Sequence, residues 1–205
     1  MEGVMPTSDQ RNKIHPHKFA LWLAMGSIAM MFAGLTSAYV VKEAGGNWRS
    51  YHLPNIFWVS TVVILISSVT AALGVRAFKR REIPKYRMLI TTTLVLGVLF
   101  GAFQFLGFYD LYTQPQQVIL NGEATGRMSP VTIPGNPAES FLFVIAGVHL
   151  LHIIGGIVAL AIVFFRAYRK RVKVYNATGL EIVASYWHFV DVLWIYLFLF
   201  FLANQ

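Results

Sequence analysis

A few polar side chains lie in apolar stretches of this sequence, where they could do chemistry. The densest group is in residues 186–194, YWHFVDVLW, in which His188 and Asp191 are three apart and would share a helical face. Trp187, Asp191 and Trp194 are spaced by four and three residues and form one stripe of the same helix. A buried His–Asp pair is compatible with a proton relay and, more often, with a polar contact that fixes helix packing.

Other polar residues stand apart from this group. His149 and His152 share a face of a second apolar segment, Gln104 lies in a third, and Glu181 stands at the start of the last one. Haem or metal ligation would need facing histidines, and only His188 is available in the other apolar segments. The chain has no cysteine and no Walker-type, HExxH or GxSxG pattern. Structural hydrogen bonds therefore explain these side chains better than a ligand set.

Small and hydroxyl residues complete the apolar segments. Gly97 and Gly101 form a GxxxG pair, which is typical of close helix packing. Ser67, Ser68 and Thr70 are expected to bond to carbonyls of their own helix.

Five apolar segments must position all of these residues. They cover residues 19–41, 56–75, 88–109, 140–165 and 182–203, each long enough to cross about 30 Å of hydrocarbon as a helix. Asp191 is the single Asp, Glu, Lys or Arg in them. With 56% hydrophobic and 13% charged residues, the chain has too few charges for a soluble surface. We predict an all-α integral membrane protein, a five-transmembrane-helix bundle that forms a single membrane domain over residues 1–205.

The basic residues predict an orientation. Of the 17 lysines and arginines, all but Lys42, Arg49 and Arg127 lie before the first segment or in the second and fourth connections. The positive-inside rule then places the N-terminus in the cytoplasm and the C-terminus in the periplasm. The net charge of +8 is expected to anchor the chain to anionic lipid, and its alternation between loops argues against nucleic acid. The long loop 110–138 could cap the bundle, meet a partner or simply connect two helices.

Several of these motifs resemble one family. Residues 179–194, GLEIVASYWHFVDVLW, resemble the last helix of the cytochrome c oxidase subunit III family, which reads G-x-E-x-x-x-x-Y-W-H-F-V-D-x-x-W there. Gly147, His149 and His152 match its G-x-H-x-x-H helix, and residues 96–104 match its G-x-x-F-x-x-x-Q helix. The likeness covers nearly the whole chain past residue 15.

The chain departs from the family in two respects. Five segments instead of seven correspond to the short bacterial form. Two carboxylates common in the family are replaced here by Ile28 and Gly107, so no role of those acids carries over to this chain.

The resemblance implies a non-catalytic subunit III of a respiratory haem-copper terminal oxidase in the bacterial inner membrane, where O2 reduction is coupled to proton pumping. It implies no catalytic residue, haem or copper on this chain, but a structural phospholipid in a cleft and support of proton uptake. Haem and copper would lie on partner subunits. The implied partners are catalytic subunit I, other oxidase subunits and a respiratory supercomplex. The polar residues would then form a lipid-binding or structural seam: Gln104, His149, His152, Glu181, Trp187, His188, Asp191 and Trp194.

Other functions stay open at this point. A subunit III homologue of a quinol oxidase or a nitric oxide reductase fits equally well, because the electron donor binds to other subunits. A small transporter is a weaker alternative, since the segments show neither repeats nor charged, broken helices at mid-membrane. A haem b carrier is weakened by the shortage of facing histidines.

Overall fold

Five long helices dominate the computed structural model, which describes residues 16–45, 49–50, 53–113, 116–120, 123–129, 137–169 and 177–204. They are α1 (Pro16–Glu43), α2 (Ile56–Lys79), α3 (Ile83–Thr113), α4 (Pro137–Tyr168) and α5 (Thr178–Ala203). All five are long and apolar enough to cross a membrane, and each contains one predicted segment. The predicted five-helix membrane bundle is therefore confirmed.

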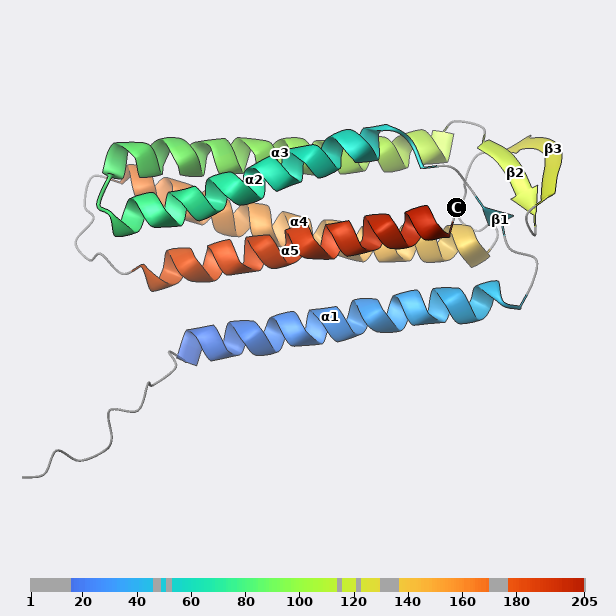
Figure 1. Ribbon diagram of the computed structural model, residues 1–205, viewed down its shortest axis with the longest axis horizontal. Coiled ribbons are helices and arrows are strands. Elements are labelled where there is room, and N and C mark those ends of the chain that lie inside the picture. Colours follow the sequence, from blue (N-terminus) through green and yellow to red (C-terminus); the bar gives the residue numbers. More distant parts are fainter. Residues whose placement is uncertain are drawn as a thin grey trace, which may run out of the picture.

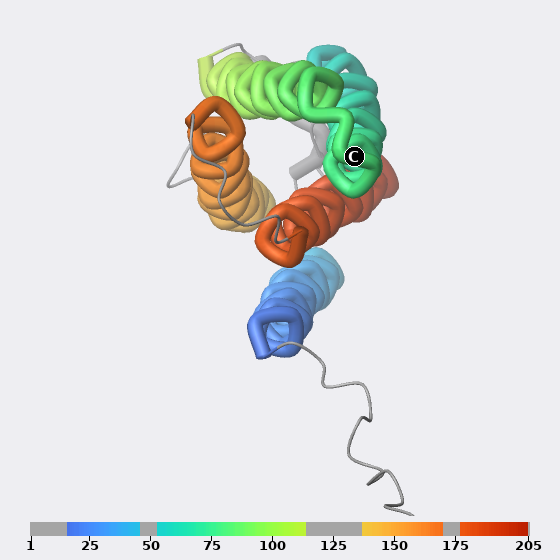
Figure 2. Tube along the Cα trace, turned by 90° about the vertical axis from the view of Figure 1, so that its left-hand side faces the viewer, coloured from blue at the N-terminus to red at the C-terminus, as the bar shows by residue number. Residues whose placement is uncertain are grey.

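Four of the helices form a ring. Figure 2 shows α2, α3, α4 and α5 surrounding a common axis, with each helix packed against the next. The interior is filled by aromatic side chains: the rings of Phe57 and Phe100 both lie 5.7 Å from Trp194, and Trp187 is fully buried. Because aromatic side chains bury large areas, these residues contribute strongly to the packing that holds the ring together.

The first helix lies outside this ring, against α4 and α5 (Figures 1 and 2). Its buried residues are Met25, Phe32, Thr36 and Tyr39, which are spaced by seven, four and three and so share one face. Most of the remaining surface of α1 is exposed. A helix in this position is held along one stripe only.

A tight turn joins α2 to α3 through residues 80–82. The amide of Glu82 donates to the carbonyl of Ala77, and that of Arg81 donates to Phe78, both at 3.0 Å, which is the pattern of a Schellman C-cap. Arg81 has a φ of 61°, the left-handed conformation that this motif requires and that glycine usually supplies. The turn reverses the chain directly and keeps α2 and α3 side by side.

A small antiparallel sheet lies beyond one end of the bundle (Figure 1). Its order is β1-β2-β3, formed by β1 (Arg49–Ser50), β2 (Gln116–Leu120) and β3 (Glu123–Ser129). Arg49 pairs with Leu120, so the α1–α2 connection joins a hairpin inside loop 110–138. This sheet was not predicted from the sequence, which left the role of the loop open. We call this the sheet end, and we call the opposite end, where α1 begins and α2 turns into α3, the basic end.

Candidate functional site

Three hydrogen bonds between side chains tie α5 to α2. Trp187 Nε1 donates to Ser67 Oγ (3.1 Å), Trp194 Nε1 donates to Thr61 Oγ1 (3.0 Å), and His188 Nδ1 and Ser68 Oγ are hydrogen-bonded at 2.6 Å. We call these six residues the α2–α5 seam. In a membrane such bonds satisfy polar groups that water cannot reach. The predicted stripe on α5 therefore faces a row of hydroxyls on α2.

The expectation for those hydroxyls is wrong at two of three positions. Thr70 does bond to a carbonyl of its own helix, that of Ser67, at 2.9 Å. Ser68, however, bonds to His188, while Ser67 accepts from Trp187 and donates to the carbonyl of Thr93 on α3 (3.4 Å). The physical reason is that imidazole and indole groups reach across from the facing helix and compete for these hydroxyls.

Two glycines form a slot for the Trp187 indole. A Cβ added at Gly97 of α3 would lie 2.9 Å from the indole, and one added at Gly156 of α4 would lie 2.8 Å from it. Real Cβ atoms do not approach so closely, so neither position accepts a side chain without a shift. Gly97 therefore leaves room for the Trp187 side chain of α5 inside the ring. This role is more specific than the general helix packing that was predicted from the GxxxG pair.

The predicted His188–Asp191 pair is long. Nδ1 of His188 lies 3.9 Å from Oδ2 of Asp191, which is beyond hydrogen-bond distance, because the imidazole bonds to Ser68 instead. Asp191 is only 2% exposed. Ser68 faces its carboxyl group too, yet neither carboxyl oxygen has a hydrogen-bond partner of good geometry in the described part of the chain.

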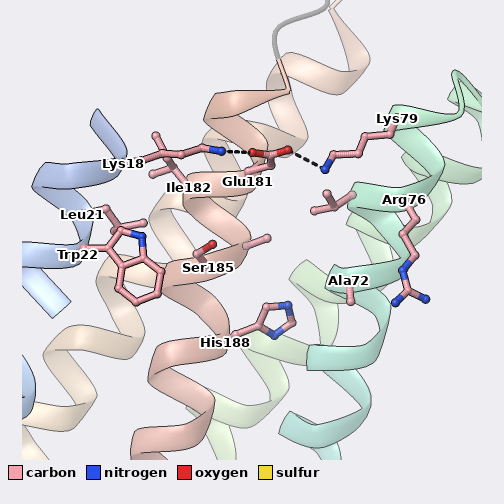
Figure 3. A pocket seen from close by; sticks show the side chains of 12 residues that line it. Lys18, Leu21, Trp22, Ala72, Arg76, Lys79, Glu181, Ile182, Ser185 and His188 are labelled. Carbon is pink, nitrogen blue, oxygen red and sulfur yellow. Dashed lines mark hydrogen bonds and ion pairs between the residues drawn. The ribbon is translucent and has the colours of Figure 1, made fainter. Parts of the chain in front are cut away.

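Glu181 lies near the basic end and joins three helices. Its carboxylate contacts Nζ of Lys18 from α1 at 2.6 Å and Nζ of Lys79 from α2 at 2.8 Å (Figure 3). All three side chains are partly exposed, so salt and water screen the attraction. This bridge fixes the relative position of α1, α2 and α5 at that end.

Beneath the bridge lies a cleft of about 580 Å³, which we call the basic cleft. Besides the bridge residues, its lining includes Trp22 from α1, Arg76 from α2, and Ser185 and His188 from α5 (Figure 3). Two lysines and an arginine surround one carboxylate here, so the mouth is positively charged. Farther in, His188 connects the cleft to the α2–α5 seam.

The other predicted residues lie apart from the basic cleft. His149 is fully buried and stacks on Trp194, with centroids 5.5 Å apart, and neither ring nitrogen has a hydrogen bond to any described residue. His152 bonds through Nδ1 to the carbonyl of Val148 in its own helix (2.7 Å). Gln104 donates to Ser60 Oγ of α2 at 3.1 Å. Within the described residues, no three His, Asp or Glu side chains gather as a metal would require.

The structure explains one departure from the family pattern. A Cβ at Gly107 would lie 2.7 Å from the ring of Phe57, which occupies the space beside this position. No carboxylate could fit there without displacing that ring. Ile28, at the other departure, is partly buried against the core.

Comparisons with known proteins place the chain in a family. The sequence model of the family Cytochrome c oxidase subunit III matches residues 17–203. The probable cytochrome c oxidase subunit 3 of Mycobacterium leprae is 31% identical over 87% of this chain and 82% of its own length. Cytochrome c oxidase subunit 3 of Corynebacterium diphtheriae is 32% identical (83% and 79%), and the probable quinol oxidase subunit 3 of Staphylococcus aureus is 27% identical (89% and 86%). The chain therefore belongs to the cytochrome c oxidase subunit III family, as a multi-pass inner-membrane subunit of a haem-copper oxidase that associates with other oxidase subunits.

Proposed function

We propose that this chain is a non-catalytic subunit III that packs beside catalytic subunit I of a terminal oxidase, holds phospholipid and supports proton uptake. Haem and copper belong to the partner subunits, and the complete oxidase can enter a respiratory supercomplex. The observation that carries the proposal is the family match over residues 17–203 together with the packed interior of the ring. A ring filled by Trp187, Phe100 and Phe57 supports a scaffold rather than a reaction site.

The proposed orientation places the basic end in the cytoplasm and the sheet end in the periplasm. The basic end carries Arg76 and Lys79 at the end of α2, whereas α3, which ends at the sheet end, has no basic residue in its last turn. Basic residues favour the cytoplasmic side, where anionic lipid also lies. The whole chain then forms a single membrane domain.

The basic cleft supports the proposed phospholipid. Lys18, Arg76 and Lys79 can neutralise a phosphate, and the exposed indole of Trp22 suits the headgroup level of a bilayer. The other predicted polar residues then stabilise helix contacts: His149, His152, Trp187, Trp194 and Gln104.

Cytochrome c is the donor that we propose for the complete oxidase. Relatives named cytochrome c oxidase subunit 3 reach 32% identity, compared with 27% for the quinol oxidase subunit. A quinol oxidase remains the second candidate, because the donor binds to other subunits.

Purification from membranes in mild detergent tests the proposal. A tagged chain should bring down haem-containing subunits, whereas the chain expressed alone should be colourless and retain phospholipid detectable by mass spectrometry. Replacing Lys18, Arg76 and Lys79 together by Gln should lower that lipid content without changing the haem of the assembled oxidase. A Soret band in the chain alone would contradict the proposal, as would solute transport by it in liposomes.

A further inference from the structure

Asp191 is a buried carboxyl group that has no hydrogen-bonded cation within the part of the chain that the structure describes. Its one ion-pair contact among the described residues is the long one to His188, at 3.9 Å. The two nearest indoles in its stripe, Trp187 and Trp194, donate their protons to hydroxyls of α2 and not to the carboxyl. A charged carboxylate is strongly disfavoured in such a site, because burial removes its hydration and no cation replaces it, so the group is expected to bind a proton instead.

A route leads from water to this carboxyl group. The side chain of His188 is 36% exposed and lines the basic cleft (Figure 3). Its Nδ1 lies 2.6 Å from Ser68 Oγ, and Ser68 faces Asp191. Imidazole and hydroxyl groups can both accept a proton and donate one. The three side chains therefore form a continuous line from the cleft to the ring interior.

We propose that Asp191 is a proton-binding site that exchanges protons with the basic cleft through His188 and Ser68. This inference deepens the proposed role in proton uptake and rests on it for its physiological meaning. In the loading step, neutral His188 carries its proton on Nδ1, and a hydronium ion in the cleft protonates Nε2 and leaves as water. Nδ1–H then passes its proton to Ser68 Oγ, while the Ser68 hydroxyl proton moves to the Asp191 carboxylate. His188 ends neutral, Asp191 ends as the acid, and no electron is transferred.

The titratable and charged groups around the route differ between its two ends. Toward the basic end are Lys18 of α1, Arg76 and Lys79 of α2, and Glu181 of α5, all at the cleft. Toward the sheet end, the contacts place His149 of α4 beside the stripe. It stacks on Trp194, and among the residues described it has no hydrogen-bond partner that could carry a proton onward. Asp191 therefore loads and unloads from the basic cleft.

A purely structural His–Asp contact would look different. In such a contact the imidazole would donate directly to the carboxylate at about 2.7–2.9 Å, as charge-assisted hydrogen bonds do. Here the imidazole bonds to a hydroxyl on another helix, and no described residue donates a hydrogen bond to the carboxyl oxygens. That arrangement leaves a group that must take its proton from solution.

Infrared spectroscopy of the full chain in lipid at neutral pH tests the inference. The wild type should show the carbonyl stretch of a protonated acid that shifts in D2O, and D191N should lack it. S68A and H188F should keep the band but slow its shift at least about tenfold, because a carrier of the proton is removed. S27A removes an exposed hydroxyl of α1 that bonds to the carbonyl of Ala24 and lies outside the cleft and the route, so it should exchange like the wild type.

Three results would overturn the inference: no such band in the wild type, a band that persists in D191N, or equal exchange rates in S68A and the wild type. If D191N fails to fold, the exchange rates of S68A and H188F still decide. The measurement needs no partner subunit, so a chain that fails to bring down haem would contradict the proposed function and leave this result intact.

Discussion

The four-helix ring and α1 are held by different means. In the ring, a buried indole fills a glycine slot and three hydrogen bonds join α5 to α2. Helix α1 is attached at separate points: Phe32 and Tyr39 pack by ring edges, Thr36 bonds to Tyr196 (2.8 Å), and Lys18 bonds to Glu181. The contrast shows that the ring is held together by side chains of complementary shape. Helix α1 depends instead on a few contacts that can be removed one at a time.

The largest expected effect is that of emptying the slot. Trp187→Ala should lower the free energy of unfolding by about 3–5 kcal/mol, because it leaves a cavity between α3 and α4. Thermal unfolding in mild detergent measures the change. Trp22→Ala is the matched control, since that indole is 69% exposed and should cost little. Equal losses in both variants would show that shape does not specify the ring.

Filling the slot from the glycine side should cost less. Gly97→Ala or Gly156→Ala should destabilise the chain by about 1–3 kcal/mol, since the new methyl group meets the indole. Gly26→Ala and Gly147→Ala are the controls, because nothing lies within 4 Å of a Cβ at either position. The controls should be neutral or slightly stabilising through helix propensity. A slot variant that unfolds at the wild-type temperature or above would refute the described packing.

Loosening α1 should be a smaller, local effect. Tyr196→Phe removes the bond to Thr36, whose hydroxyl also bonds to carbonyls of its own helix, so about 1 kcal/mol or less is expected. The chain has no cysteine, so spin labels can be attached at cysteines introduced on the exposed faces of α1 and α4. The distance distribution between them should broaden, while a pair on α3 and α5 should not change. If the distance distributions of both label pairs broaden, α1 and the ring loosen together and are not held independently.

The smallest effect is expected at the bridge of the basic end. Glu181→Gln should cost no more than about 1 kcal/mol, because the bridge is partly exposed. The difference in melting temperature from the wild type should shrink as salt is raised. Glu82→Gln, which removes the more exposed pair with Lys85, is the control. A large, salt-independent loss would show that α1 is held chiefly at this end.

Much of the fold could be predicted from the sequence, because hydrocarbon thickness alone sets the length of a spanning helix. The stripe of Trp187, Asp191 and Trp194 could also be predicted, since it depends only on helical spacing. The partners of that stripe could not, because Ser67 and Ser68 can bond equally to their own carbonyls or to a neighbouring helix.

Two features needed the tertiary structure. The glycine slot depends on the depth at which α3, α4 and α5 meet, and a GxxxG pair does not encode that depth. The sheet pairs Arg49 with Leu120, residues far apart in the sequence, and short strands carry too few side chains to show a period. The spacing of His188 and Asp191 correctly placed the two residues on one face of the helix. It predicted too short a contact between them, because helical spacing takes no account of the competing bond from His188 to Ser68.

The turn at residues 80–82 has a consequence for how the chain is made. A connection this short, with its amides already paired, lets α2 and α3 form as a helical hairpin as soon as both have left the ribosome. Trp187 lies more than a hundred residues later, so its slot stays unfilled until α5 is synthesised. We therefore expect α2 and α3, which follow α1 into the membrane, to pair with each other first, and the ring to close only when the last helix arrives. During translation, the nascent chain would then be most exposed to quality-control proteases in the interval before α5 enters the bilayer.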